Sequence, residues 1–289
     1  MGFDSTVSHN GKKVINDDEA NRGKLYTWMK EVINIVRPKM FIAENVKGMV
    51  SLGDAVQVIR RDFTHAGEDG YIVLDPRVLH AGAYGVPETR ERVIFIGIRR
   101  EGLNRDILEM IERGELPEEL NPYPSPTHRL LGEKESNNHL KRAVTCRDVL
   151  ANLPEPNESN DPSQQEYSRA KFQDNNSQGQ SEIDMDGYGP TIRSEHHGNI
   201  EYRRLSEEHG GRNVDEFDRG LTERRLTPRE CALIQTFPPD YQFVSRKRNS
   251  TRYFVSPSGA YRVIGNAVPP MLAYNIGRKI QQVLPQYFD

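Results

Sequence analysis

The chain has 289 residues, 28% of them charged and 35% hydrophobic, and its mean hydropathy of −0.74 indicates a soluble protein of one large or two smaller domains. No apolar run is long enough to cross a bilayer, and the first residues lack the basic and apolar segments of a secretion signal. The two cysteines, Cys146 and Cys231, form no metal or redox spacing, so a reducing cytoplasm is expected.

The formal net charge of −3 gives no support for nucleic-acid binding through bulk charge, so such binding would depend on local basic clusters. The candidate clusters are Arg99-Arg100, Arg203-Arg204, Arg224-Arg225 and the run Arg246-Lys247-Arg248 with Arg252. For each cluster taken alone, the alternative is an ordinary solvated surface.

Apolar spacing predicts alternating helices and strands from residue 25 onward. Residues 25–36 carry apolar side chains at helical spacing, and the pattern stops before Pro38. The apolar run 40–43 is typical of a buried parallel strand, and residues 56–63 show another helical face.

Two strand-like stretches follow this helix. Residues 71–79 contain Pro76, which favours an edge strand or a bulge, and residues 93–98 form a second apolar strand. Helix, strand, helix, strand and strand make an α/β pattern with an antiparallel pair at its end.

Beyond residue 117 the chain becomes rich in Pro, Asn, Ser, Gln and Gly as far as residue 220, with one helical stretch near 144–153. The composition of residues 157–189 would by itself permit disorder.

Two helices are expected near the C-terminus. Thr227, Pro228 and Glu230 form a helix-start signal with a capping box, and that helix stops before Pro238. A last helix with one apolar face is expected after Pro270.

Four short motifs stand in order along the chain. They are Glu44-Asn45-Val46 within Lys39–Gly48, Arg90 and Arg92 within Tyr84–Val93, the stretch Arg225–Pro238, and Gly265–Pro270. Together they resemble motifs of the DNA cytosine-5 methyltransferase family. The resemblance covers nearly the whole chain and implies an α/β, Rossmann-like S-adenosylmethionine-dependent methyltransferase fold. That fold would lack its N-terminal strands and carry a small, mostly irregular or β target recognition insert.

The resemblance implies a reaction on a cytosine flipped out of double-stranded DNA. A cysteine thiolate adds to ring carbon 6, carbon 5 takes the methyl group of S-adenosylmethionine, and elimination restores the ring. Glu44, at a strand end, would bind the ring nitrogen and amine edge and donate a proton. Arg90 and Arg92 would hold the flipped nucleotide and steady the nucleophile; the alternative is a strand entry paired with Glu91.

The resemblance also implies binding residues outside the catalytic set. Asn266, Ala267 and Val268 would close one wall of the S-adenosylmethionine site, with Gly265-Asn266 as a turn before the last helix. Thr191, Ile192 and Arg193 would contact DNA, since Thr191-Ile192 resembles a dipeptide of the recognition domain. No metal site is expected, because His196-His197 has no third ligand at suitable spacing.

The sequence departs from the family at two places. Glu88 stands where the family usually has Gln, and an ionised carboxylate accepts hydrogen bonds but cannot donate them. Gly2-Phe3 normally follows Pro-Cys-Gln, but here Met1 precedes it, so the nucleophilic cysteine and the glycine loop that holds the cofactor are missing. Cys146, at a helix start that would lower a thiol pKa, is a weak substitute.

We therefore expect a truncated chain or one part of a split DNA cytosine-5 methyltransferase, of a prokaryotic restriction–modification system in the cytoplasm or on the nucleoid. Its partners would be double-stranded DNA and a complementing chain carrying Pro-Cys-Gln and the glycine loop. The alternative is a catalytically inactive DNA-binding or assembly subunit, or a relic. The expected division is a partial catalytic domain (1–116), a connecting segment (117–156), a recognition region (157–222) and C-terminal helices returning to the catalytic domain (223–289).

Overall fold

The computed structural model describes residues 8–9, 12–13, 25–134, 139–174, 179–194, 200–212, 214–248 and 250–288. The expectations about Met1, Gly2-Phe3 and His196-His197 lie outside these residues. The chain divides into two compact units: unit 1 holds residues 1–79, 91–125 and 275–289, and unit 2 holds residues 80–90 and 126–274. The four-part division expected from the motifs stays a prediction. No described helix is long and apolar enough to cross a membrane.

Unit 1 is built on a sheet whose central strand is β6. Strand β3 (Met40–Val46) and strand β4 (Tyr71–Val73) both pair antiparallel with β6 (Glu91–Arg99), and β5 (Arg77–His80) also pairs with β6. In β6 all residues from Arg92 to Ile98 are buried, as expected for a strand covered on both faces. Phe41 lies opposite Gly97, and its ring occupies the space that a side chain there would need. A short hairpin of β1 (Ser8–His9) and β2 (Lys12–Lys13) stands apart from this sheet.

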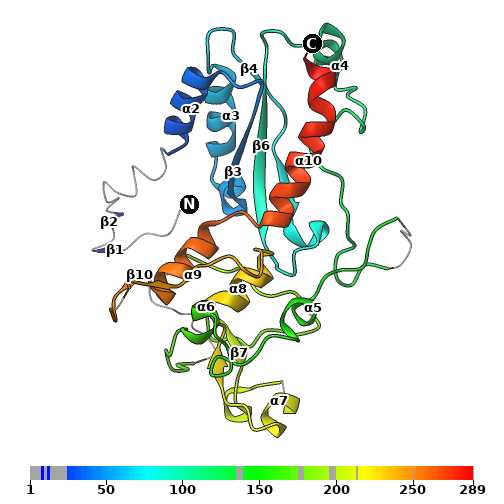
Figure 1. The fold of residues 1–289 in the computed structure, drawn as a ribbon. Helices are drawn as coiled ribbons and strands as arrows, with labels where there is room; N and C mark the ends of the chain where they lie inside the picture. The colour runs from blue at the N-terminus through cyan, green and yellow to red at the C-terminus, as the bar shows by residue number, and fades with distance from the viewer. Residues whose placement is uncertain are drawn as a thin grey trace. The chain divides into compact units, whose positions relative to one another are not determined.

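Helices cover both faces of this sheet (Figure 1). Helix α2 (Leu25–Val36) and helix α3 (Ala55–Thr64) bury Ile33 and Phe63 against one face, in a cluster with Phe41 and Phe95. The 3₁₀ helix η1 (Lys47–Ser51) adds Met49 to that cluster. Helix α4 (Arg105–Arg113) and the C-terminal part of α10 (Pro270–Tyr287) cover the other face, where the buried residues are Ile98, Ile107, Val283, Tyr287 and Phe288.

Most predicted elements of unit 1 are present, and one expectation about pairing is wrong. The strand-like stretch 71–79 is broken into β4 and β5 around Pro76, as proline in a strand predicts. The run 40–43 was expected to be a parallel strand, but in the described residues β3 pairs only with β6, and antiparallel. Its apolar composition reflects burial of Phe41 and Ala43 beneath the helices, which does not depend on strand direction.

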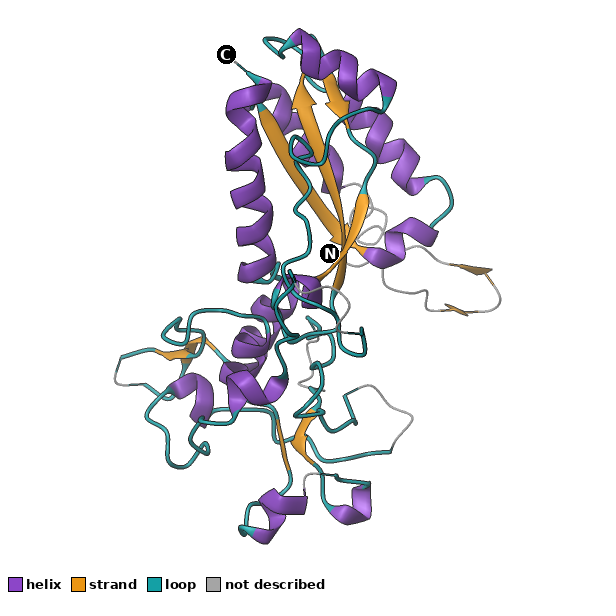
Figure 2. Ribbon diagram, turned by 90° about the vertical axis from the view of Figure 1, so that its right-hand side faces the viewer, coloured by secondary structure: helices purple, strands orange, loops and turns teal. Residues whose placement is uncertain are grey.

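Unit 2 consists mainly of short elements and loops (Figure 2). Its helices are α5 (Cys146–Leu150), α6 (Pro162–Gln165), α7 (Val214–Asp218), α8 (Pro228–Ile234), α9 (Pro257–Asn266), η2 (Ala81–Tyr84), η3 (Glu207–His209) and the first turn of α10. Its strands form two antiparallel pairs, β7 (Tyr202–Arg204) with β8 (Arg224–Arg225) and β9 (Ser245–Arg246) with β10 (Tyr253–Val255). Helices α5, α8 and α9 surround one apolar core.

The predicted start of helix α8 is confirmed in detail. Thr227 accepts a hydrogen bond from the Glu230 amide at 3.0 Å, and the Glu230 carboxylate accepts one from the Thr227 amide at 2.8 Å. Both partners are buried, so this capping box satisfies amides that water cannot reach.

Three arginines and three glutamates form a closed ring of ion pairs inside unit 2. In order around the ring they are Arg203, Glu216, Arg204, Glu155, Arg224 and Glu230, with Glu230 adjacent to Arg203 at 3.6 Å. We call this set the Arg–Glu ring. All of its members are buried except Glu155, whose side chain is 19% exposed.

Two basic clusters from the sequence therefore lie inside the protein. Arg203-Arg204 and Arg224-Arg225 were expected to face DNA or solvent, but all four side chains are buried. Arg225 donates to the carbonyls of Ala170 and Gly179 at 2.7 and 2.6 Å. Neighbouring carboxylates and carbonyls satisfy these guanidinium groups, which makes their burial tolerable.

Candidate functional site

Glu44 and Arg92 come together on one face of the sheet in unit 1. In the β3–β6 register Glu44 lies opposite Ile94 and Val46 lies opposite Arg92. Since side chains alternate between faces, this register places Glu44 diagonally across from Arg92, within reach of a long side chain. The Arg92 Nε donates to the Glu44 Oε1 at 2.7 Å, with side-chain exposures of 10% and 23%. Arg92 thus fixes the orientation of a carboxylate that solvent can reach.

The alternative partner for the arginines, Glu91, is engaged elsewhere. Its carboxylate pairs with the Lys47 ammonium at 2.7 Å. Asn45, between Glu44 and Val46, turns its side-chain oxygen back to accept from the Val46 amide at 2.8 Å. This contact steadies the backbone at the point where β3 leads into η1.

Arg90 belongs to unit 2, and both terminal nitrogens of its guanidinium donate to backbone carbonyls. Its guanidinium donates to Ile192 at 3.0 Å, to Gly265 at 2.7 Å and to Ala267 at 2.8 Å. With 1% of its surface exposed, Arg90 connects two segments that lie about a hundred residues or more away in the chain. One of them contains Thr191-Ile192, and the other is the segment expected at the cofactor site.

Glu88 supports the same connection. Its Oε1 accepts from the Ile192 amide at 2.7 Å, and the Arg90 Nη1 lies 3.5 Å from the same oxygen. The amide oxygen of glutamine could make the first contact equally well, so the substitution preserves this hydrogen bond. The Thr89 amide donates to the Gly189 carbonyl at 2.9 Å, and the Thr191 hydroxyl donates to the Thr89 carbonyl at 2.8 Å.

Two of the three predicted DNA-binding residues, Thr191 and Ile192, are therefore held by the motif around Arg90. Ile192 is completely buried in the core of unit 2, whereas Arg193 is exposed. Glycine at position 265 is required here, because a side chain would collide with the backbone of Arg193 and Ser194. This close approach brings the end of helix α9 against the Thr191–Arg193 segment.

The predicted cofactor-binding residues, 266–268, come directly after Gly265 in the chain. Gly265-Asn266 was expected to be a turn, but both residues lie in the last turn of α9, which Ser256 caps. Helix formation continues to Asn266 because Ala267 still donates its amide to Ile264 at 3.1 Å. Asn266 is exposed, and Ala267 and Val268 are partly exposed.

Both cysteines are buried and have unreactive thiols. Burial raises the pKa of Cys146 to about 12, so the position of this residue at a helix start does not make its thiol more acidic. Burial also raises the pKa of Cys231 well above its ordinary value. A thiol must ionise to act as a nucleophile, so neither cysteine is suited to attack cytosine in this fold.

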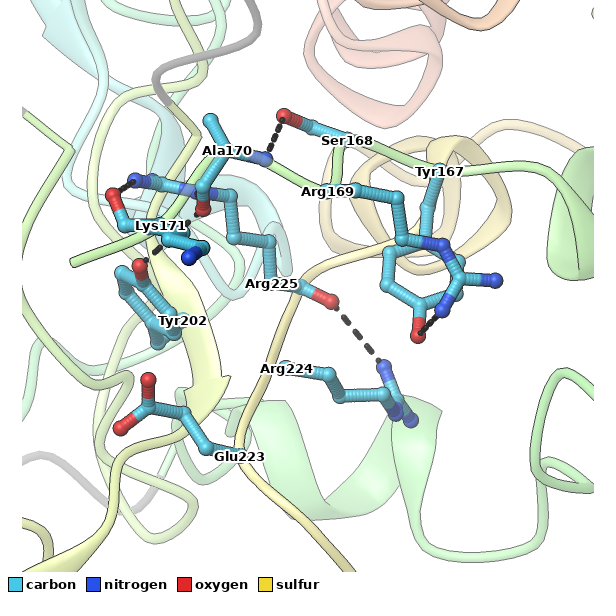
Figure 3. A pocket seen from close by; sticks show the side chains of 9 residues that line it. All are labelled: Tyr167, Ser168, Arg169, Ala170, Lys171, Tyr202, Glu223, Arg224 and Arg225. Carbon is cyan, nitrogen blue, oxygen red and sulfur yellow. Dashed lines mark hydrogen bonds between the residues drawn. The ribbon is translucent and has the colours of Figure 1, made fainter.

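A pocket of about 190 Å³ lies in unit 2 (Figure 3). Residues 167–171, Tyr202 and Glu223–Arg225 line it. The Arg225 guanidinium lies 4.3 Å from the centre of the Tyr202 ring and is held by backbone carbonyls. Arg224 belongs to the Arg–Glu ring, so the pocket's two buried arginines are used for structure. The described residues contain no group of three side chains that would hold a metal ion.

The ordered motifs, the sheet with helices on both faces and Glu44 near the end of β3 are typical of DNA methyltransferases. The family profile described as C-5 cytosine-specific DNA methylase matches residues 5–282, and the chain belongs to that family. The family prediction from the four motifs is thereby confirmed.

Relatives with assigned names are type II methyltransferases. M.NgoFVII of Neisseria gonorrhoeae is 29% identical over 94% of this chain and 66% of its own length. M.BsuRI of Bacillus subtilis is 32% identical over 98% of this chain and 58% of its own length. The chain thus spans about three fifths of the length of these relatives.

A solved structure supports the fold. The chain is similar to a protein of Escherichia coli, assigned as a DNA modification methyltransferase encoded within a prophage, with a TM-score of 0.53 and 20% identity. The match covers 92% of this chain and 75% of that one. The predicted mixed α/β methyltransferase fold is confirmed at this level.

Proposed function

We propose that this chain is the base-handling part of a DNA cytosine-5 methyltransferase of a restriction–modification system. The observation that carries the proposal is the Glu44–Arg92 pair at 2.7 Å, found near the end of β3 in a member of this family. A carboxylate with one oxygen fixed and with solvent access can present its other oxygen to a ligand.

In this proposal the protonated form of Glu44 binds the amine and ring-nitrogen edge of a flipped cytosine. It donates its proton to the ring nitrogen as the nucleophile adds, and the resulting carboxylate pairs with Arg92. Arg92 is a positioning residue that holds the carboxylate in place. Arg90 acts at a distance from the base, because its guanidinium is already bound to three carbonyls. Its contacts support a role in shaping the segments around Thr191 and Asn266. Contact of Thr191, Ile192 and Arg193 with DNA stays part of the proposal.

The proposed methyl donor is S-adenosylmethionine, which supplies the methyl group when bound. Asn266 offers an exposed amide, and Ala267 and Val268 offer partly exposed apolar side chains. This chemistry fits one wall of a nucleoside site. Residues 241–288 contain no carboxylate that could bind ribose hydroxyls, so other residues must complete the site.

We further propose that the nucleophilic cysteine comes from a polypeptide segment outside this sequence, either in a complementing chain or in a longer form of this one. The buried thiols of Cys146 and Cys231 support this. The second candidate function is an inactive DNA-binding subunit. If no such segment exists, the burial of both cysteines leaves the chain without a nucleophile and favours this second function.

An apolar surface on unit 1 is suited to receive that segment. On helix α2, Trp28, Val32 and Ile35 are 72%, 56% and 80% exposed, and their spacing places them on one side of the helix. Strand β3 pairs in the described residues with β6 alone, and its Ile42, on the sheet face opposite Phe41 and Ala43, is 40% exposed. An unpaired strand edge and an exposed apolar stripe together favour a partner that adds a strand and buries the stripe.

The proposal is tested by restoring activity in trans. The chain is mixed with a polypeptide segment that carries Pro-Cys-Gln and the glycine loop, and transfer of labelled methyl from S-adenosylmethionine to duplex DNA is measured. Glu44→Gln should lower the rate by about 100-fold or more, as expected for loss of a general acid. Glu91→Gln is the matched control, because its carboxylate pairs with Lys47 instead, and it should leave the rate within about twofold of the unmodified chain. Equal rates for the two variants would exclude Glu44 as the acid.

A further inference from the structure

The hairpin formed by β9 and β10 is the most basic exposed element of unit 2. Arg246, Lys247, Arg248 and Arg252 fall within seven residues, and all four are exposed. From residue 241 to residue 288 the sequence has seven lysines and arginines and no aspartate or glutamate. In a chain with a net charge of −3, this segment is a local concentration of positive charge.

The base of the hairpin is anchored in the core of unit 2. Phe243 and Val244 are buried just before β9, and the amide of Val244 donates to the Ser163 hydroxyl at 3.0 Å. Tyr253 and Val255 pack against the same core from β10. The hairpin leads directly into helix α9 (Figure 1). A rigid base fixes where the charged end can reach.

The end of the hairpin presents its charge to solvent. The Lys247 amide donates to the Arg252 carbonyl at 2.9 Å, which closes the turn. Arg246 is paired with Glu166, but Lys247, Arg248 and Arg252 make no ion pair with any described residue. The Lys247 ammonium lies 5.5 Å from the centre of the Phe254 ring, and Phe254 is 72% exposed. This contact holds the lysine over an aromatic ring without neutralising it.

We propose that this hairpin is a phosphate-binding element that contacts the backbone of double-stranded DNA outside the recognised bases. The inference rests on the proposed function for its ligand, and it adds a binding site separate from Glu44 and from residues 191–193. Three uncompensated cations on a fixed support match a row of phosphates, and such contacts set the position of a protein on DNA without reading sequence.

The test uses the double variant Arg248→Ala/Arg252→Ala of the full chain. Its matched control is Arg105→Ala/Arg113→Ala, which removes two exposed arginines that pair with Glu109 on helix α4. Binding to a 30-base-pair duplex is measured by fluorescence anisotropy from about 50 to 300 mM salt. If each arginine contacts one phosphate, the slope of log K against log salt should fall by about 1.8 in the hairpin variant. At about 0.1 M salt its affinity should fall on the order of 10- to 60-fold, equally for different DNA sequences.

The outcomes separate this inference from the proposed function. If the unmodified chain binds the duplex and both double variants keep its slope and affinity, the hairpin does not contact phosphates and the inference is wrong. If the hairpin variant loses affinity for one DNA sequence only, the hairpin reads bases and the inference is also wrong. If the unmodified chain does not bind duplex DNA at any salt concentration tested, the proposed function and the inference both fail. Thermal unfolding of both variants should match that of the unmodified chain, because all four side chains are exposed.

Discussion

The change Glu230→Gln should destabilise unit 2 strongly, although it replaces only one buried carboxylate oxygen by an amide nitrogen. Glu230 is 1% exposed and accepts two hydrogen bonds from Arg224, at 2.8 and 2.9 Å. It also lies 3.6 Å from Arg203. Glutamine keeps the shape and can still accept from the Thr227 amide, so the capping box of α8 is retained. The change therefore removes the charge and leaves three arginines with two glutamates in the Arg–Glu ring.

The expected cost follows from burial. Removing one partner of a buried ion pair costs about 3–5 kcal/mol, because the remaining charge stays buried without compensation. Glu109→Gln is the control, since Glu109 forms two ion pairs of the same type at 3.2 Å on the surface of α4. Exposed pairs contribute about 0–1 kcal/mol, so the two variants should differ by roughly 3 kcal/mol.

Urea unfolding followed by circular dichroism measures the free energy of unfolding of both variants. A loss of about 3 kcal/mol or more for Glu230→Gln, with less than about 1 kcal/mol for Glu109→Gln, is expected. A Glu230→Gln protein within about 0.5 kcal/mol of the unmodified chain would refute the reasoning. It would mean that the ring arginines find other partners or water once the charge is removed.

Three further outcomes follow from the structure. Burial opposes ionisation of the ring carboxylates at positions 155 and 230, but Arg224 lowers the pKa of both below the ordinary glutamate value. Their contribution to the free energy of unfolding is therefore complete above about pH 4.5 and should be lost progressively at lower pH. Acid titration followed by circular dichroism measures this loss. Cys146 and Cys231 should resist a thiol reagent at pH 8 in the folded chain and react fully in denaturant; rapid labelling of either in the native protein would contradict their burial. Gly265→Ala should cost about 1–3 kcal/mol through collision with the Arg193 carbonyl, whereas Gly277→Ala in α10 has open space and should be neutral or stabilising, so equal thermal stability of the two variants would count against the close approach.

The sequence predicts the elements of unit 1 well because local rules determine them. Apolar spacing marks helix α2, and proline marks the break between β4 and β5. Strand direction could not be predicted from the apolar run of β3, because a strand covered by helices has the same composition in either direction. The capping box at Thr227 was predictable because it is formed by residues three apart.

The Arg–Glu ring could not be predicted from the clusters that contain its arginines. Arg203-Arg204 and Arg224-Arg225 look like surface charge when the sequence is read locally, since arginine is seldom fully buried. Their partners Glu155, Glu216 and Glu230 are spread over 75 positions and meet only in the fold. The pairing of β7 with β8, which brings the two arginine pairs together, was the missing information.

The sequence proposes residues for the site but does not predict their contacts. The motifs identified Glu44, Arg90 and Arg92, but alternate residues of one short motif serve different purposes. Arg92 orients the Glu44 carboxylate, whereas Arg90 binds the carbonyls of Ile192, Gly265 and Ala267. Those carbonyls carry no side-chain signal, so a sequence cannot reveal which arginine they bind.

The order of the polar segment 157–189 also could not be predicted from its composition. Its composition permits disorder, yet in the described part Ser163, Gln164, Ile183 and Met185 are buried. Gln164 donates to the Pro154 carbonyl at 2.8 Å and accepts from the Thr227 hydroxyl at 2.6 Å. Order here depends on hydrogen bonds to distant residues, which composition does not record.

The most direct test of the central claim is the position of the methyl group on DNA. The chain is combined with a segment that carries the cysteine nucleophile, supplied with labelled S-adenosylmethionine and duplex DNA, and the digested nucleosides are separated. The account predicts label in 5-methylcytosine for the mixture and no label for this chain alone. Label in another nucleoside, or methylation by this chain alone after both Cys146 and Cys231 are changed to Ser, would contradict it.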